Sequence, residues 1–303
     1  MIIAIFGVLL LLNRQTGGMF EGFFIFVFPI PMVAYSAKHG LKSSLPVFFC
    51  TILISFLCGT PTSIFYAISE SLIGMVFGAR IYGKKDMRHT LFIVVVMSAA
   101  LELVSTLALA SLFGIDLNAD IAEMQKMLNT VAAQAGVTGL EDIFSADYLR
   151  RIYVISIGFV GALEGVAVYY LSLAILRKLR YPIPKAEPLF DYYPHKAVGI
   201  VCLLLTFLYQ YTFAKPLSNE VLQNIVQSVG ICATLFLSFF GYYALVLALR
   251  IYLRLSAILG AIISVVLFML FSAFLPYLGF FYLSMGLHEH MAETLAERQK
   301  QGG

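Results

Sequence analysis

The chain has 303 residues, of which 60% are hydrophobic and 12% are charged, and its mean hydropathy is +0.90. Soluble domains carry about 25% charged residues and about 45–50% apolar ones, so the composition excludes an ordinary water-soluble domain. The formal net charge is only +3 and the basic residues are scattered, which argues against a nucleic-acid-binding surface. We therefore expect an all-α polytopic membrane protein whose partner is the lipid bilayer.

Apolar runs follow one another along the chain, and a helix needs about 20 residues to cross a bilayer. The predicted segments are residues 1–12, 17–37, 45–58, 61–82, 91–113, 152–176, 197–213, 222–249 and 255–287. The first run has no basic stretch before it and no small-residue cleavage site after it, so we interpret it as a short membrane segment. The last run is too long for one span. Pro276 and Gly279 interrupt it, which predicts two short spans or one span with a re-entrant piece, and ten segments are favoured over nine.

Loop charges predict the orientation, because cytoplasmic loops of membrane proteins are enriched in Lys and Arg. Alternate loops hold thirteen basic residues, and the intervening loops hold five. The thirteen are Lys38, Lys42, Arg80, Lys84, Lys85, Arg88, Arg177, Lys178, Arg180, Lys185, Lys196, Arg250 and Arg254. The five are Arg14, Lys126, Arg150, Arg151 and Lys215. This asymmetry predicts a cytoplasmic N-terminus.

Two connections are longer than simple hairpins. Residues 115–148 are acidic and predicted to lie outside, and within them an amphipathic helix is indicated by apolar residues at helical spacing behind a possible Asn118 cap. These apolar residues are Ile121, Met124, Leu128 and Val131. Residues 181–196 contain four prolines, which predicts an extended cytoplasmic linker. We expect a six-helix unit at 1–180 and a second membrane unit at 197–303.

Several blocks of sequence resemble one known family. They are PIPMVAYSAKHGLKSS at 29–44, CGTP at 58–61, LIGMVFGARIYGKKD at 72–86, LFGIDL at 112–117, YPIPKAEPLFDYYPHK at 181–196 and LGFFYLSMGLHEHMAETLAERQK at 278–300. Their order and spacing resemble the YybS-like family, the DUF2232 group of bacterial membrane proteins. That family distantly resembles the S-components of energy-coupling-factor transporters, which have six helices with both ends in the cytoplasm. The resemblance implies the bacterial cytoplasmic membrane and a coupling protein as partner.

Ionisable side chains near the bilayer centre are the sharpest functional signals, because a charge there costs about 2.5–3.5 kcal/mol on insertion scales. Three carboxylates qualify, Glu70, Glu102 and Glu164, and each lies near the middle of its predicted segment. No Lys, Arg or His has a comparable position in the sequence. These three glutamates are therefore either neutral or able to meet a proton, a metal ion or an amine.

Residues near the three glutamates extend this pattern on the helix faces. The polar ones are Tyr66, Ser98 and Ser105, and the small ones are Gly158, Gly161 and Gly165. Small residues at this spacing allow close approach of a neighbouring helix or a ligand. The resemblance to S-components implies a docking face for a coupling module there, whereas packing within the same chain is the commoner reason for such glycines.

A second polar stripe lies in the later half of the chain, where Asn224, Gln227, Thr234, Ser238 and Gly241 share one helical face. We expect it to form interhelical hydrogen bonds with Thr206, Tyr209 and Gln210. The four cysteines, Cys50, Cys58, Cys202 and Cys232, lie in apolar runs without C-x-x-C spacing. They are typical of packing residues and not of a metal site or disulfides.

Two functional hypotheses remain. The leading one is a small-molecule or ion transporter, or a substrate-binding subunit, with its site at the three glutamates among the first six helices. The alternative is a non-transporting scaffold or assembly factor whose cytoplasmic proline linker and tail recruit another protein. Such a scaffold would have a close-packed core with each glutamate hydrogen-bonded to a neighbouring helix. The sequence has no nucleotide-binding loop, no nucleophile with a base and no H-E-x-x-H motif, so neither an enzyme nor a cofactor is indicated.

Overall fold

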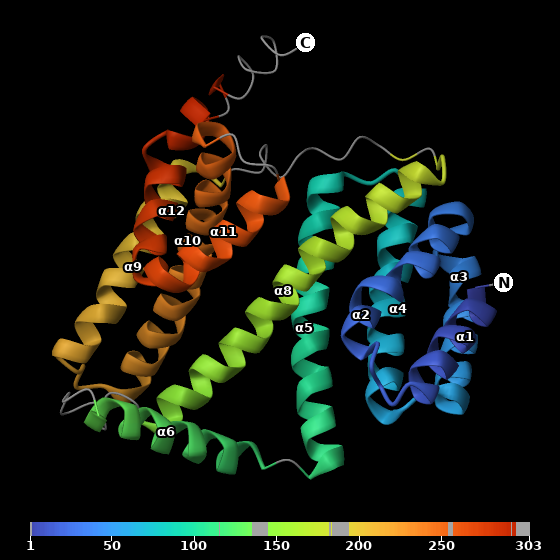
Figure 1. Ribbon diagram of the computed structural model, residues 1–303, viewed down its shortest axis with the longest axis horizontal. Helices are drawn as coiled ribbons and strands as arrows, with labels where there is room; N and C mark the ends of the chain where they lie inside the picture. The colour runs from blue at the N-terminus through green and yellow to red at the C-terminus, as the bar shows by residue number, and fades with distance from the viewer. Residues whose placement is uncertain are drawn as a thin grey trace. The chain divides into compact units, whose positions relative to one another are not determined.

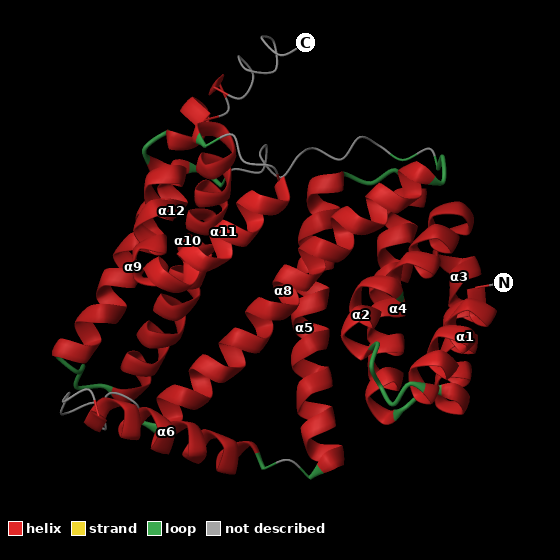
Figure 2. Cartoon of the chain, viewed as in Figure 1, coloured by secondary structure: helices red, strands yellow, loops and turns green. Residues whose placement is uncertain are grey.

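The computed structural model describes residues 2–114, 116–134, 145–181, 183, 194–253, 257–291 and 293–294. Within these ranges the chain is helical apart from its connections and contains no strand (Figure 2). The predicted all-α membrane architecture is confirmed, because seven helices in the described ranges are long and apolar enough to cross a membrane. The chain divides into two compact units, Met1–Glu187 and Pro188–Gly303, with the boundary inside the predicted linker.

Unit 1 begins with α1 (Ile2–Gln15), α2 (Glu21–Val27) and α3 (Pro29–Cys58) (Figure 1). The chain of α3 reverses at Gly40, whose φ of 76° and ψ of 174° are not helical. The hydroxyls of Ser36 and Ser44 are hydrogen-bonded at 2.7 Å, whereas eight residues of continuous helix would separate them by about 12 Å. α3 therefore consists of two limbs, 29–39 and 41–58. The second limb contains the predicted segment 45–58, and the first limb together with α2 covers most of the predicted segment 17–37.

The next helix, α4 (Pro61–Tyr82), starts with a capping box in which Thr60 and Ser63 satisfy each other's backbone N–H groups. Gly74 and Gly78 let it pack directly on the first limb of α3. A Cβ atom at Gly74 would lie 2.5 Å from the carbonyl oxygen of Pro29, so a larger residue does not fit this interface. At the far end of α4, the Tyr82 ring packs on Gly40.

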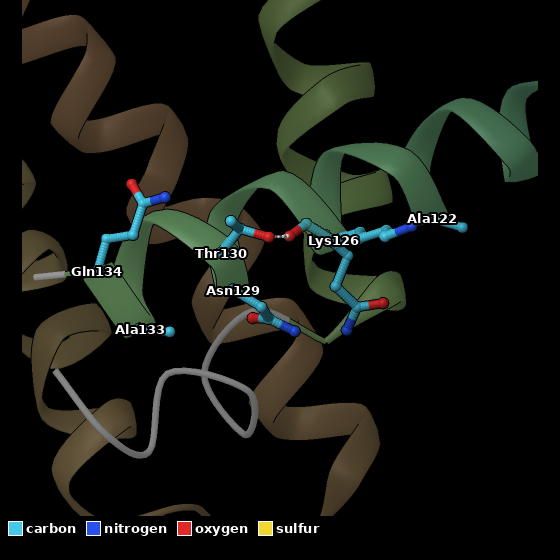
Figure 3. Close-up of a pocket in the computed structure, with 7 residues that line it drawn as sticks. Ala122, Lys126, Asn129, Thr130, Ala133 and Gln134 are labelled. Carbon is cyan, nitrogen blue, oxygen red and sulfur yellow. Dashed lines mark hydrogen bonds between the residues drawn. The ribbon is translucent and has the colours of Figure 1, made fainter. Parts of the chain in front are cut away.

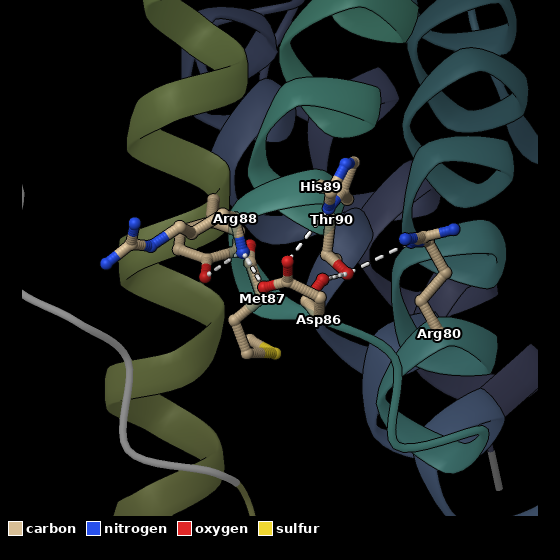
Figure 4. Close-up of polar contacts among 7 residues, drawn as sticks. Arg80, Asp86, Met87, Arg88, His89 and Thr90 are labelled. Atoms are coloured by element: carbon tan, nitrogen blue, oxygen red, sulfur yellow. Dashed lines mark hydrogen bonds and ion pairs between the residues drawn. The ribbon is translucent and has the colours of Figure 1, made fainter. Parts of the chain in front are cut away.

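Unit 1 is completed by α5 (Met87–Phe113), α6 (Leu117–Gln134) and α8 (Ala146–Lys178). Arg80 Nε donates to Thr90 Oγ1 at 3.0 Å and joins the end of α4 to the start of α5 (Figure 4). The buried Tyr169 of α8 reaches the same end, where its hydroxyl donates to the carbonyl oxygen of Met87 at 3.2 Å. α5 therefore runs antiparallel to α4 and to α8 in this unit.

The predicted amphipathic helix is α6, which follows the end of α5 and lies against the start of α8 (Figure 1). The predicted cap was wrong, because Asp116 accepts from the backbone N–H of Asn118 at 2.9 Å. The Asn118 side chain instead accepts from Arg150 Nη2 at 2.6 Å. Of the predicted apolar stripe only Ile121 is fully buried. Met124 and Val131 are exposed at 40% and 62%, which suits a helix lying on a membrane surface.

Unit 2 is built on the antiparallel pair α9 (Lys196–Ala214) and α10 (Glu220–Tyr252). Thr234 donates to Thr206 at 3.2 Å, and Gln227 Nε2 donates to Thr212 Oγ1 at 3.4 Å. The predicted hydrogen bond of Thr206 with this stripe is thus confirmed, whereas Gln227 pairs with Thr212, which was not among the predicted partners. Gly230 packs against Tyr209, which brings the two helix axes close together.

The last apolar run forms a hairpin of α11 (Ala257–Phe271), a 3₁₀ turn at Ser272–Phe274 and α12 (Leu275–Ser284). Gly279 packs against Leu237 and Gly241, near the middle of α10. α12 then returns to the end where α9 begins, and Ser284 Oγ donates to the carbonyl oxygen of Lys196 at 3.0 Å. The run enters and leaves at the same end of unit 2. The predicted break in this run is confirmed, and it lies at Ser272–Phe274, just before Pro276.

Candidate functional site

The three glutamates lie on three neighbouring helices of unit 1, at a similar depth. The Arg80–Thr90 hydrogen bond gives a common reference for depth. Glu70 precedes Arg80 by ten residues of α4, which is about 15 Å along the helix. Glu102 follows Thr90 by twelve residues of α5, which is about 18 Å. α8 is aligned with α4 by the stacked rings of Phe77 and Tyr169, whose centroids are 5.1 Å apart. Glu164 precedes Tyr169 by five residues and reaches the same level.

Glu70 is the most deeply buried of the three, with 6% of its surface exposed. Its Oε2 atom is buried and has no hydrogen-bond partner among the described residues. Leaving a buried polar group without a partner costs about 1–3 kcal/mol, and more when the group is charged. The charges of Glu102 and Glu164 would also repel a charge on Glu70. Glu70 is therefore an unsatisfied group inside the helix bundle.

Glu102 and Glu164 are half-buried and have little compensation. Thr106 Oγ1 is 3.5 Å from Glu102 Oε1, which is at the outer limit of a hydrogen bond. Among the described residues no Lys, Arg or His forms an ion pair with any of the three glutamates. No three acidic, His or Cys side chains in that part of the chain are placed to hold one metal ion.

The small residues of α8 pack on α5 beside these carboxyls. A Cβ atom at Gly161 would lie 2.7 Å from the Cβ of Glu102, and one at Gly165 would lie 2.9 Å from Ser98 Oγ. Gly158 is less constrained, with its nearest neighbour, Leu103, at 3.6 Å. All three predicted packing glycines thus face α5 of the same chain.

The polar residues proposed for the site are placed unequally. Ser98 is 4% exposed, and its Oγ atom has no hydrogen-bond partner in the described chain. Ser105 is buried two turns further along α5. Tyr66 is half-buried and lies within electrostatic range of all three glutamates. Tyr66 and Ser98 therefore both lie near the carboxyls. Ser98 and Glu102 pack against the same residue of α8, Gly161.

A fourth carboxylate, Glu21, was missed by the sequence reasoning. Its Oε1 atom accepts from Thr60 Oγ1 at 2.7 Å, from Thr62 Oγ1 at 2.5 Å and from Asn13 Nδ2 at 3.4 Å. These contacts join residues up to 41 positions apart, so no local pattern announces them. Glu21 is also within electrostatic range of Tyr66.

The opposite end of unit 1 is held by a different polar group (Figure 4). Asp86 caps α5 by accepting from the backbone N–H of Arg88 at 2.9 Å, and its other oxygen lies 2.8 Å from His89 Nδ1. The hydrogen bond with the His89 ring and the one from Arg88 lower the pKa of Asp86 below its usual value. This carboxylate is exposed and fixes the turn between α4 and α5.

Two hollows lie away from the three glutamates. One runs along the polar face of α6 and is lined by Lys126, Asn129 and Thr130 (Figure 3). The other, of about 650 Å³, lies between α1 and α3 and is mostly apolar, with Lys38 and His39 in its wall. Both carry basic side chains, so neither provides a second acidic site.

Comparisons with known proteins agree with this membrane architecture. The family model described as "Predicted membrane protein (DUF2232)" matches residues 4–288. The chain is 20% identical over 196 residues to the "Uncharacterized protein YybS" of Bacillus subtilis (strain 168). The aligned region covers 61% of this chain. The match spans about 62% of the length of that relative. No solved structure matches the chain.

Proposed function

The chain belongs to the DUF2232 family of predicted membrane proteins, and from that premise we propose that it is a small-molecule or ion transporter, or a substrate-binding subunit. Its site is formed by the three glutamates on α4, α5 and α8 of unit 1. The substrate is a cation, because the three carboxyls at one depth form no ion pair with a described Lys, Arg or His side chain. The membrane is the bacterial cytoplasmic membrane.

One observation carries the proposal: Glu70 Oε2 is buried and has no hydrogen-bond partner among the described residues. A scaffold protein gains nothing from such an atom, because its helices are held more tightly when each buried polar group is paired. A binding site needs one, since the atom acquires its partner when the ligand arrives. The Ser98 hydroxyl, which is also buried and has no partner in the part of the chain that the structure describes, supports the same interpretation.

The experiment is mass spectrometry of small molecules that co-purify with the detergent-extracted protein. Wild type is compared with Glu70→Gln and Glu102→Gln, which keep the size of the side chain and remove its charge. Glu220→Gln serves as the matched control, because Glu220 is exposed at the start of α10 in unit 2. We expect a cationic compound that is retained by wild type and by the control and lost from both site variants.

Identical small-molecule profiles for all four proteins would contradict the proposal and leave the scaffold hypothesis. A compound that Glu70→Gln and wild type retain equally would show that the three glutamates do not form the binding site.

A further inference from the structure

Glu21 differs from the three deeper glutamates in how its carboxylate is held. Three donors converge on its Oε1 atom, from Asn13 on α1 and from Thr60 and Thr62 at the start of α4. Hydrogen bonds to a carboxylate favour its charged form. Oε2 makes no hydrogen bond within the described residues, so the half-buried carboxylate keeps one oxygen for another partner.

The two ends of unit 1 carry different charge. The end with Gly40, where α4 and α8 finish, has nine described basic residues and one acidic residue, Asp86. The basic residues are Lys38, Lys42, Arg80, Lys84, Lys85, Arg88, Arg177, Lys178 and Arg180. The end with Glu21 has four basic and five acidic residues in the described ranges. A cation is therefore repelled from the first end, whereas the second end is nearly neutral and lets it approach.

Tyr66 connects Glu21 with the deeper carboxyls. It lies on α4 one turn beyond Thr62 and one turn before Glu70. Its hydroxyl is within electrostatic range of Glu21 and also of Glu102 and Glu164. Tyr66 therefore lies on α4 between the threonines that hold Glu21 and Glu70, whose Oε2 is buried and has no hydrogen-bond partner among the described residues.

We propose that cations reach the three glutamates from the Glu21 end of unit 1, and that the Glu21 carboxylate is the first group to bind them on this route. The inference rests on the proposed function and adds the direction of approach and a positioning residue. Glu21 raises the local concentration of cations, so its loss slows their arrival while the deeper site stays intact.

The test uses one introduced cysteine as a reporter. In a chain whose four native cysteines are replaced by alanine, Thr106→Cys places a thiol one turn from Glu102 toward the Glu21 end. Two methanethiosulfonate reagents are compared on the purified protein, one carrying a trimethylammonium group and one carrying a sulfonate. The rate of thiol modification by each reagent is then measured with and without Glu21→Gln.

We expect Glu21→Gln to slow the cationic reagent by roughly three- to tenfold and not to slow the anionic one. Glu21→Asp keeps the charge and should retain most of the cationic rate. Asp86→Asn is the matched control, because it removes the acidic group described at the opposite end, and it should leave the rate unchanged. Should Glu21→Gln not fold, the salt dependence of the two rates in the parent protein replaces it: only the cationic rate should fall with salt.

Equal cationic rates with and without Glu21→Gln, or an equal loss in Asp86→Asn, would overturn the route. In that case a co-purifying cation that is still lost from Glu70→Gln leaves the proposed function standing. If the cationic rate does not depend on Glu21 and Glu70→Gln also retains the co-purifying cation, both the route and the proposed function would be overturned.

Discussion

Ser98 on α5 lies directly against Gly165 on α8, where a Cβ atom would be 2.9 Å from the serine oxygen. The same interface holds Gly161 against Glu102 and the carbonyl oxygen of Ser98. α5 and α8, which carry Glu102 and Glu164, can approach this closely only because α8 has glycines at the contact. The separation of α5 and α8 therefore sets the space around the carboxyls.

Gly161→Ala should push α8 away from α5, because the added methyl would meet backbone atoms that cannot move aside. We expect a destabilisation of about 1–3 kcal/mol, measured as a lower thermal midpoint in detergent. Gly158→Ala is the control, since its Cβ has 3.6 Å of clearance and alanine favours helix. Equal midpoints for the two variants would mean that the α5–α8 contact is looser than described.

Glu70→Gln should leave the thermal midpoint unchanged or raise it, by about 1 kcal/mol in free energy, because glutamine removes a potential charge from a buried position. If the carboxyl is a ligand group, the same variant loses the stabilisation that a bound cation confers on wild type. Thermal unfolding with and without the co-purified compound measures both effects. A full ligand response in the glutamine variants at all three positions would make these glutamates structural.

Gly40→Ala should weaken unit 1, because the backbone there has φ of 76° and ψ of 174°, a region that only glycine occupies readily. The expected loss is about 1–3 kcal/mol in thermal or denaturant unfolding. The Tyr82 ring lies 3.0 Å from the added Cβ, so Gly40→Ala with Tyr82→Ala separates steric contact from backbone strain. Full recovery in the double variant would show that the ring contact alone was responsible.

The hairpin of α11 and α12 starts and finishes at the same end of unit 2, so we expect its tip to stop inside the membrane. In a chain without native cysteines, Ser272→Cys at the tip should resist an impermeant thiol reagent added from the side that labels Ser218→Cys. Ser218 lies in the exposed loop between α9 and α10, at the end of unit 2 that the hairpin does not reach. Equal labelling of both cysteines would mean that α11 and α12 each cross the membrane.

Asp86 gives a prediction about pH. Its pKa is lowered in the folded chain, so its stabilisation is present above the unfolded pKa of about 4 and is lost as the pH falls through the folded value. Asp86→Ala should therefore lower the thermal midpoint at neutral pH, and the difference from wild type should shrink below about pH 4. A difference that persists at lower pH would assign the effect to the lost helix cap alone.

The sequence by itself determined the all-helical membrane class, most helix positions and the three carboxyls without cationic partners. These features follow from apolar length and from the cost of a buried charge, which act within one segment. The cap of α6 was predicted at Asn118, two residues from Asp116, because several polar residues there have similar capping ability.

Only the tertiary structure decided the path of the last hairpin and the contacts of Glu21. Residues 255–287 have enough apolar length for two short spans, and their hairpin form depends on Gly279 packing against Leu237 and Gly241 of α10. Glu21 is held by side chains from positions 13, 60 and 62. Contacts between residues so distant in the chain depend on how helices pack, which hydrophobicity along a single segment does not specify.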